Sequence, residues 1–456
     1  MASRGADKTR TMDTVYVGLM GLGVVGSGVA SILQEKQSGI TSQVGGRVDL
    51  RRVLVRDIGK PRTVPLPTGV LTTDPAAILD DPAIAVVIEL MGGERPAYDY
   101  IQAALRQGKH VITANKEVIA KHGPTLLSLA EANGVAIHFE ASVGGGIPLI
   151  APFRESLLAN EIAQVHAIIN GTTNYILTRM GKDGLDLPEA LAEAQALGYA
   201  EPDPSYDIEG TDSAYKLAIL ASLAFHTHVA PDQVYREGIR GLTARDFRYA
   251  RELGYAIKLL AIARRGAPLR PPGNGGASLA AAGDAVEVRV HPAFIPDDRI
   301  LARVDGVYNA VEVEGDLTGR IMFYGRGAGS LPTTSAVVSD LIDLAREVRR
   351  GMTPRVLPGP KASFPILPME EVCTRYYVRM AVRDKPGVLA EIARVLGDLQ
   401  ISIASVIQKE SNEESQIAEI MLMTHLALER SMQQALRELA SLPVVAEIGA
   451  VVRVEG

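Results

Sequence analysis

The stretch VYVGLMGLGVVGSG, from Val15 to Gly28, decides the fold of the first part of this chain. A β-branched run leads into glycines spaced as GxGxxG at Gly21, Gly23 and Gly26, and a helical pattern follows. Gly21 permits a tight turn, Gly23 leaves the backbone open to close approach, and Gly26 lets the helix pack closely on the strand. The free N–H groups at the start of that helix favour a phosphate, which predicts a dinucleotide site. A purely structural glycine-rich turn is the alternative.

The sequence around this turn alternates short β-branched runs with helical stretches, which predicts a parallel, doubly wound α/β sheet of the Rossmann type. The expected strands are 15–17, 48–55, 85–88, 110–113 and 135–139, and the expected helices are 24–37 and 96–107. We place this domain at residues 13–139. The helix after Gly329 is expected to return to it over residues 329–353.

The remaining sequence predicts two further domains. Residues 140–328 are expected to form a second, α+β domain, with strands near 161–170 and 285–290 and a flexible surface insertion at 266–283. Five prolines mark a linker at 354–368. Residues 369–456 follow the order strand, helix, strand, strand, helix, strand of a ferredoxin-like βαββαβ module. Met1 to Met12 are interpreted as a frayed leader.

Composition excludes several classes of protein. The chain has 456 residues, 47% of them hydrophobic and 22% charged, as in ordinary folded proteins. A net charge of -6 gives no global attraction to nucleic acid or to an anionic membrane. A lone cysteine, Cys373, and the lack of an export leader or a long apolar span indicate the cytoplasm.

The end of the second strand bears on the choice of dinucleotide. Val55 is followed by Arg56 and Asp57, with Lys60 close behind. An arginine here suits the 2′-phosphate of NADP(H), so NADP(H) is favoured, whereas Asp57 leaves NAD(H) open. A solvated cation at the strand end is the alternative for Arg56.

The densest chemistry lies between Glu201 and Lys216. Five carboxylates and no cation occur between Glu201 and Asp212, and two prolines in this loop are expected to prevent a helix. Thr211 can cap the next helix, on which Asp212 and Lys216 share a face ahead of a nearly apolar stretch. A buried lysine beside a carboxylate suits a proton donor. The alternatives are a solvated acidic loop and an ordinary surface ion pair.

Two other segments follow predicted strands. VITANK places Lys116 beyond the carboxyl end of one strand, where open α/β sheets hold ligands. After the next strand, Glu140 precedes three glycines, 144–146, whose flexible backbone could aim carbonyls at a hard cation. A hinge between domains explains the glycines equally well.

With these pieces in view, nearly the whole chain resembles the homoserine dehydrogenase family. The matching blocks are GLGVVGSGV at Gly21, VITANK to Lys116, FEASVGGGIP from Phe139, NGTTNYI from Asn170, LGYAEPDPSYDIEGTDSAYKLAIL from Leu197, HPAFIP at His291, VYNAV at Val307 and GRGAGSLPTTSAVVSD from Gly325. The resemblance implies NAD(P)H-dependent interconversion of L-aspartate 4-semialdehyde and L-homoserine, a step toward threonine, methionine and isoleucine.

Carried over by position, the resemblance makes Lys216 the general acid that protonates the aldehyde oxygen, with Lys116 assisting and contacting the cofactor. It implies that Glu201, Asp207 and Asp212 hold the substrate, whose ammonium group suits an acidic loop. Together with the fingerprint, it gives as the cofactor-binding set Gly21, Leu22, Gly23, Val24, Val25, Gly26, Arg56, Gly92, Thr113, Ala114, Lys116 and Gly327. It assigns a monovalent cation, sodium, to Glu140, Val143, Gly145 and Ile147.

The C-terminal module resembles an ACT domain, with Asp384-Lys-Pro-Gly387 at its first strand-to-helix turn. Such modules pair and bind amino acids, and the effector that the family implies is L-threonine. An inert dimerisation module is the alternative. By analogy the enzyme is a homodimer or a homotetramer. A rival function of another class is a non-catalytic sensor of NADP(H) and an amino acid, which would have no need of Lys216.

Overall fold

The computed structural model describes residues 13–266, 285–352, 363–412 and 416–455. The predicted leader, nearly all of the predicted insertion and the first part of the predicted linker lie outside these residues. The chain divides into two compact units. The first comprises residues 1–159, 218–231 and 323–363, and the second comprises residues 160–217, 232–322 and 364–456. Each unit is described by itself.

The first unit is built on a parallel six-stranded sheet, as predicted from the alternating pattern. In spatial order its strands are β3 (Leu71–Thr72), β2 (Arg47–Leu54), β1 (Thr14–Met20), β4 (Ile84–Glu89), β5 (His110–Thr113) and β6 (Ile137–His138). The order reverses beside β1, and β1 leads directly into the glycine-rich turn. That topology is typical of dinucleotide-binding sheets, which hold their ligand at this switch point.

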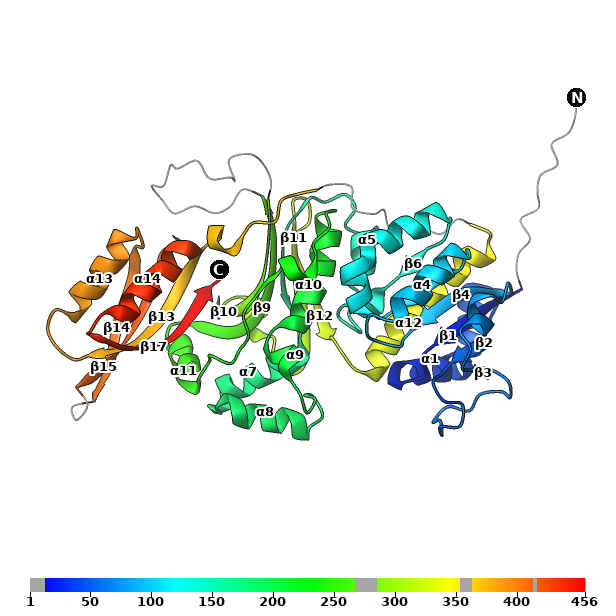
Figure 1. The fold of residues 1–456 in the computed structure, drawn as a ribbon, viewed down its shortest axis with the longest axis horizontal. Helices are drawn as coiled ribbons and strands as arrows, with labels where there is room; N and C mark the ends of the chain where they lie inside the picture. The colour runs from blue at the N-terminus through cyan, green and yellow to red at the C-terminus, as the bar shows by residue number, and fades with distance from the viewer. Residues whose placement is uncertain (1–12, 267–284, 353–362, 413–415, 456) are drawn as a thin grey trace, which may run out of the picture. The chain divides into compact units, whose positions relative to one another are not determined.

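The helices of the first unit form two groups by their contacts, and Figure 1 labels α1 and α12 of one group and α4 and α5 of the other. One group is α1 (Val24–Glu35), α2 (Gln37–Val44) and α12 (Ser330–Arg349), and the other is α3 (Ala76–Leu79), α4 (Ala97–Arg106) and α5 (Lys116–Ala132). The short α6 (Ile150–Glu155) also belongs to this unit. Because α12 packs against α1 and α2, residues far apart in sequence share one apolar core.

The second unit contains most of a mixed 11-stranded sheet. Its main path runs β12 (Gly319–Arg326), β11 (Tyr308–Gly315), β7 (Ile162–Ile168), β9 (Tyr255–Gly266), β10 (Ala285–Pro296), β17 (Val445–Val454), β13 (Cys373–Arg383), β15 (Ile417–Thr424) and β14 (Ile403–Asn412). Two short strands, β8 (Tyr235–Arg236) and β16 (Ala427–Leu428), pair beside this path. The helices are α7 (Gly171–Asp183), α8 (Leu187–Ala196), α9 (Ser205–Ile208), α11 (Ala244–Glu252), α13 (Val388–Asp398) and α14 (Glu429–Ser441), while α10 (Thr211–Ala224) passes from this unit into the first.

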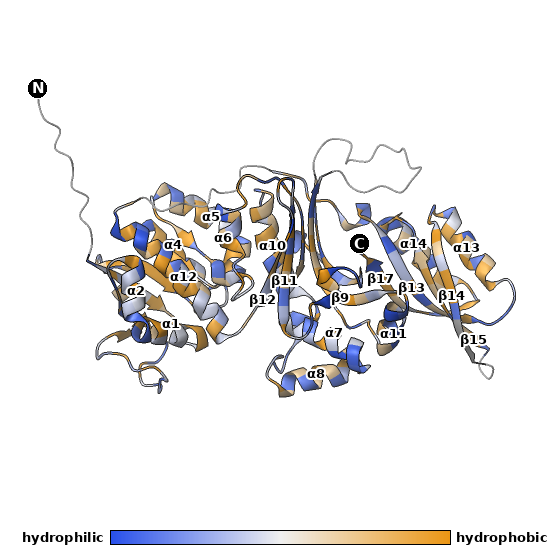
Figure 2. Ribbon diagram, turned by 180° about the vertical axis from the view of Figure 1, so that it is seen from behind, coloured by the Kyte–Doolittle hydropathy of each residue, from blue (hydrophilic) through white to orange (hydrophobic). Residues whose placement is uncertain are grey.

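The last part of the second unit has the predicted βαββαβ order. Strand β13 lies between β15 and β17, and α13 and α14 lie together against these strands (Figure 1). Both helices carry blue and orange residues in Figure 2, and their apolar residues, such as Ile392 and Met432, are buried in one core. The amphipathic pattern therefore explains why two helices suffice to cover this sheet.

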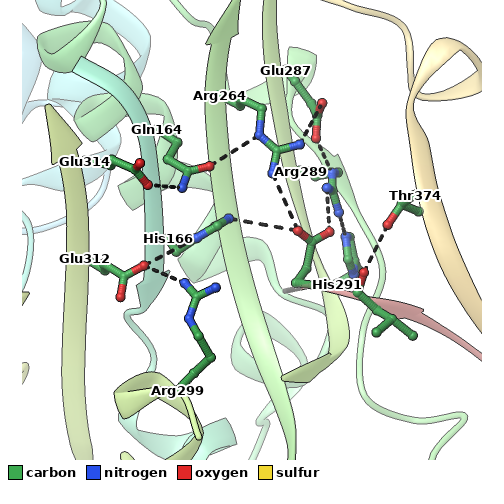
Figure 3. Close-up of polar contacts among 12 residues, drawn as sticks. Gln164, His166, Arg264, Glu287, Arg289, His291, Arg299, Glu312, Glu314 and Thr374 are labelled. Carbon is green, nitrogen blue, oxygen red and sulfur yellow. Dashed lines mark hydrogen bonds and ion pairs between the residues drawn. The ribbon is translucent and has the colours of Figure 1, made fainter. Parts of the chain in front are cut away.

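The sheet does not stop at the edge of this module. The end of β17 pairs in parallel with β10, through Ala293 with Arg453 and Phe294 with Val454. Beyond the pairing, Glu455 is buried and joins a polar network whose members Arg264, Arg289 and His166 are labelled in Figure 3. Its carboxylate is 2.6 Å from Arg289, 3.8 Å from Arg264 and 3.9 Å from His166. The C-terminal strand thus joins two halves of one sheet.

No helix among the described residues combines the length and the apolar character that crossing a bilayer requires.

Candidate active site

Lys216 lies in a buried polar cluster of the second unit, on the first turns of α10. Its Nζ donates to Oδ2 of Asp212 at 2.7 Å and to the carbonyl of Ile169 at 2.9 Å. The Lys216 side chain is only 12% exposed and that of Asp212 4%, so the pair is not an ordinary surface ion pair. An ammonium group has three N–H bonds, and these contacts use two of them. The third can donate to a substrate oxygen.

The acidic loop differs from its prediction in one respect. Residues Ser205–Ile208 form the short helix α9, although two prolines in the loop were expected to prevent a helix. Pro204 stands at the N-cap, where its missing N–H removes no helical hydrogen bond, so the helix can start directly after it. Helix α10 begins at Thr211 itself, so Thr211 is the first helical residue and not the predicted cap before it.

The carboxylates of this loop do not all meet. Asp207 and Asp212 both accept from the amide of Asn170, whereas Glu209 pairs with Arg240. The side chain of Glu201 is exposed. Burial, together with the charge of Asp212, raises the pKa of Asp207. Two carboxylates beside one lysine can hold a cationic group while the lysine supplies a proton.

In the first unit, a cavity of about 470 Å³ lies at the ends of β1 and β2. Five of the predicted cofactor residues line it, namely Gly21, Leu22, Gly23, Arg56 and Gly92. Gly21 has a φ of +102°, and a Cβ there would lie 2.7 Å from the carbonyl oxygen of Leu90. A Cβ on Gly26 would lie 2.1 Å from the carbonyl of Gly21, while one on Gly23 would meet nothing within 4 Å. The backbone is therefore open at Gly23, as an approaching pyrophosphate requires.

Three cations line the end of this cavity beside β2. They are Arg56, Lys60 and Arg62, accompanied by Asp57. Asp57 accepts from the N–H of Gly59 at 2.8 Å and, through its carbonyl, from Arg62. The buried Nε of Arg62 has no hydrogen-bond partner among the described residues. An anion bound here could accept hydrogen bonds from Lys60 and Arg62 as well as from Arg56. Arg62 was not among the predicted residues.

Thr113 ends β5 and Lys116 follows it, at the same edge of the sheet as the fingerprint. Thr113 is fully buried and donates to Glu89 at 2.6 Å, so its hydroxyl supports the loop after β4. Glu89 in turn accepts from the N–H of Met91 at 2.7 Å, and burial raises its pKa. Asn115 caps α5 and donates to the carbonyl of Gly93 at 2.7 Å, and Lys116 begins that helix after Ala114. Thr113 thus contributes to the cofactor site indirectly, by supporting the loop that carries Gly92.

The predicted cation loop is also in the first unit. The carboxylate of Glu140 accepts from the backbone N–H groups of Leu149, Ile150 and Ala151 at 2.5–2.9 Å, and so caps the start of α6. A Cβ on Gly145 would lie 2.6 Å from the carbonyl of Gly327, so these two predicted residues lie side by side. Among the described residues, no group of three His, Cys, Asp or Glu side chains is placed to hold a metal. Any cation here would depend on carbonyl oxygens.

Val24 and Val25 lie on the first turn of α1, where Val24 is 74% exposed. They adjoin the glycine turn without lining the cavity described above. Sequence reasoning missed Asn170, Glu89 and Arg62 as site residues. Only Asn170 carried a usable signal, since asparagine directly before a glycine and two threonines is typical of a helix N-cap.

The comparisons with known proteins cover almost the entire chain. Family models match at residues 21–140 ("Homoserine dehydrogenase, NAD binding domain"), 148–342 ("Homoserine dehydrogenase") and 376–444 ("ACT domain"). A homoserine dehydrogenase of Synechocystis is 45% identical over 97% of this chain and 99% of its own length. The crystal structure of a homoserine dehydrogenase from Thiobacillus denitrificans shares 43% identity with a TM-score of 0.88, covering 98% of this chain and 99% of that one. A hyperthermophilic archaeal homoserine dehydrogenase in complex with NADPH shares 26% identity with a TM-score of 0.60, covering 76% of this chain and 100% of that one.

A cavity at the glycine-rich turn of a Rossmann sheet and the matched NAD-binding family model place the chain among the nicotinamide-dependent oxidoreductases. The extent of the sequence match then decides which one. The chain belongs to the homoserine dehydrogenase family, with an ACT domain at its C-terminal end.

Proposed function

We propose that Lys216 is the proton donor in the reduction of L-aspartate 4-semialdehyde to L-homoserine. The observation that carries this role is its buried contact with Asp212, which keeps an ammonium group in place with one N–H bond remaining. A nicotinamide cofactor, when bound, would supply the hydride for the aldehyde carbon. Lys216 gives its proton to the aldehyde oxygen as negative charge develops there, and in the reverse direction it takes the hydroxyl proton.

Asp207 and Asp212 are suited to the ammonium group of the substrate, because both belong to the Lys216 cluster. Glu201 would join them through movement of its exposed side chain. Lys116, at the start of α5, would assist and contact the cofactor. We divide the chain accordingly into a cofactor domain at 13–139 with 329–353, a catalytic domain at 140–328, a linker at 354–368 and a regulatory domain at 369–456.

The preferred cofactor is NADP(H), with NAD(H) as the weaker alternative. Arg56, Lys60 and Arg62 at one end of the cavity support this preference, since guanidinium groups pair well with a 2′-phosphate. The NADPH named for the archaeal relative supports it as well. A sodium ion would be held mainly by the carbonyls of Val143, Gly145 and Ile147, because backbone N–H groups already occupy much of the Glu140 carboxylate.

The ACT domain is proposed to bind L-threonine and lower the activity, and the enzyme to assemble as a homodimer or homotetramer. The family match at residues 376–444 supports an ACT fold. The N-cap of α13, Gly387, with a φ of +95°, gives the first strand-to-helix turn an open backbone to which an amino acid could bind.

The deciding experiment is NADPH oxidation with aspartate semialdehyde by the wild type and by Lys216→Ala. Loss of the donor is expected to lower kcat by about 10²–10⁴-fold. Lys182→Ala is the matched control, because Lys182 is 63% exposed at the far end of α7 and pairs with Asp305. Wild-type turnover that Lys216→Ala leaves unchanged would remove Lys216 from the mechanism. A wild type without turnover would favour the sensor function.

A further inference from the structure

Asn170 stands at the junction between β7 and α7, where it caps the helix. Its Oδ1 accepts from the N–H of Thr173 at 2.8 Å and from the hydroxyl of the same residue at 3.0 Å. The side chain is buried, with 5% of the residue exposed. A backbone N–H can only donate, so these contacts fix the amide oxygen toward the helix and the NH2 group away from it.

The NH2 group of Asn170 donates to two carboxylates at once. It lies 2.7 Å from Oδ1 of Asp207 on α9 and 2.9 Å from Oδ2 of Asp212 on α10. That same Oδ2 of Asp212 accepts from Lys216. The amide of Asn170 therefore bridges Asp207 and Asp212, the proposed substrate carboxylates. It also contacts the same oxygen of Asp212 that accepts from Lys216, the proposed proton donor.

We propose that Asn170 is a positioning residue, which holds Asp207 and Asp212 ionised side by side and thereby fixes Lys216 for proton transfer. The inference rests on the proposed role of Lys216. Two carboxylates that face one lysine repel each other, and the burial of the site strengthens this repulsion. The two amide hydrogens offset it, because each stabilises one ionised carboxylate.

The choice of asparagine at position 170 supports two roles, helix capping and the bridge between carboxylates, rather than capping alone. Aspartate and serine cap a helix as well as asparagine does. Aspartate would add a third carboxylate to the cluster, and serine would lose the bridge to the other two. Among the good capping residues, asparagine alone supplies an acceptor for the helix and two donors for the carboxylates.

Lys216 makes a second contact with the same junction, through the carbonyl of Ile169. The turn that Asn170 stabilises thus supplies a direct ligand to the ammonium group and a bridge to its carboxylate partner. Rotation of the Asn170 side chain would loosen both Asp207 and Asp212 from this turn.

The test compares Asn170→Ser with Asn174→Ser. Serine at 170 keeps the helix cap but removes the bridge. Asn174 is the matched control: it is a buried amide on the same helix, and it donates to the carbonyls of Val304, Gly306 and Tyr308 at 3.0 Å. In Asn170→Ser we expect the pH at which kcat/KM falls on the acid side of its pH profile, the acid limb, to rise by about one unit, because the carboxylates ionise less readily. Asn174→Ser is expected to lower the Tm and leave that limb in place.

A second readout needs no turnover. Competitive acylation at a fixed pH, followed by mass spectrometry, gives the reactivity of the Lys216 amine in each variant. Asn170 and Lys216 donate to the same Oδ2 of Asp212, so without the amide this oxygen is left to Lys216. We expect slower acylation of Lys216 in Asn170→Ser and wild-type acylation in Asn174→Ser. The isosteric Asn170→Asp, which adds a carboxylate, should slow it further. Wild-type acylation of Lys216 in both the serine and the aspartate variant would overturn the positioning role, whether or not the wild type reduces aspartate semialdehyde.

Discussion

At the scale of single residues, His110 makes the stability of the Rossmann sheet depend on pH. It begins β5, and its Nδ1 accepts from the N–H of Ala136 just before β6 at 3.1 Å. Burial lowers the pKa of His110 to about 4, so the ring is neutral in the folded protein at pH 7. The neutral ring can accept the Ala136 hydrogen bond, whereas the protonated ring can only donate.

The sign of the effect follows from the lowered pKa. Between about pH 6.5 and 4 the unfolded chain binds a proton at His110 and the folded chain does not, so stability is lost as the pH falls. The substitution His110→Asn replaces the ring with a neutral amide that can accept but does not titrate. We expect the wild type to lose about 1–2 kcal/mol more than His110→Asn between pH 7 and pH 5. Unfolding curves by circular dichroism at the two pH values measure this, and equal losses would contradict it.

At the scale of elements, the loop after β2 is expected to select the cofactor. It carries Arg56, Lys60 and Arg62 into one cavity, and the Nε of Arg62 lacks a partner among the described residues. Arg56→Ala and Arg62→Ala should each lower kcat/KM for NADPH by roughly 10-fold or more, because a charge-assisted hydrogen bond to the 2′-phosphate is lost. The value for NADH should change little.

Arg47→Ala is the matched control for this loop. Arg47 begins the same strand at its other end and pairs with Asp49 there. Initial rates with both cofactors give the NADPH to NADH ratio for each variant. A ratio that falls equally in Arg47→Ala, or that stays at the wild-type value in both other variants, would refute the assignment.

Most elements of the Rossmann half and the ACT domain could be predicted because their periodicity is regular. The strand near Val15 is a mostly apolar run, and the strand near Tyr377 is rich in aromatic and β-branched residues. Strand β9, which was not predicted, and the end of β10 beyond the predicted 285–290 were harder, since buried charged residues such as Lys258 and Arg289 interrupt the apolar pattern. Their charges are satisfied by partners distant in sequence, such as Asp305 and Glu455. A single sequence does not reveal those pairings.

The same reason explains which contacts of the candidate site could be predicted from the sequence. Asp212 and Lys216 are four residues apart on one helix, so their contact could be predicted from spacing. The contact of Asn170 with Asp207 spans 37 residues, and it depends on how β7, α7 and α9 pack. The exposed Glu201 shows the converse, because sharing a loop with Asp207 does not place its carboxylate in the cluster.

At the scale of the whole molecule, the second unit ties its ACT strands to the rest of its sheet. Arg379 on β13 contacts the fully buried Asp246 of α11 at 2.8 Å. Arg453 on β17 contacts Glu237 at 2.7 Å. These ion pairs accompany the pairing of β17 with β10. Removal of the ACT domain at the linker would therefore expose the edge of β10 and leave several buried charges without their partners. Regulation by threonine is better tested in the full-length chain.

Glu455 provides the sharpest test of this connection. Arg289 is 1% exposed and lies 2.6 Å from both Glu455 and Glu287, within the network of Figure 3. Glu455→Gln leaves the buried guanidinium with one carboxylate in place of two. We expect the free energy of unfolding of the second unit to fall by roughly 2 kcal/mol or more, because a buried charge loses one of its two carboxylate partners. Turnover at 25 °C should persist, since Lys216 and its contacts are untouched.

Glu447→Gln is the control, on the strand that Glu455 directly follows, and its side chain is exposed. Neutralising it should change stability by less than about 0.5 kcal/mol. Urea unfolding followed by circular dichroism compares the two variants with the wild type. If Glu455→Gln and Glu447→Gln unfolded at the same urea concentration, the C-terminal strand would contribute backbone pairing alone, and the buried charges would have no part in holding the two halves of the sheet together.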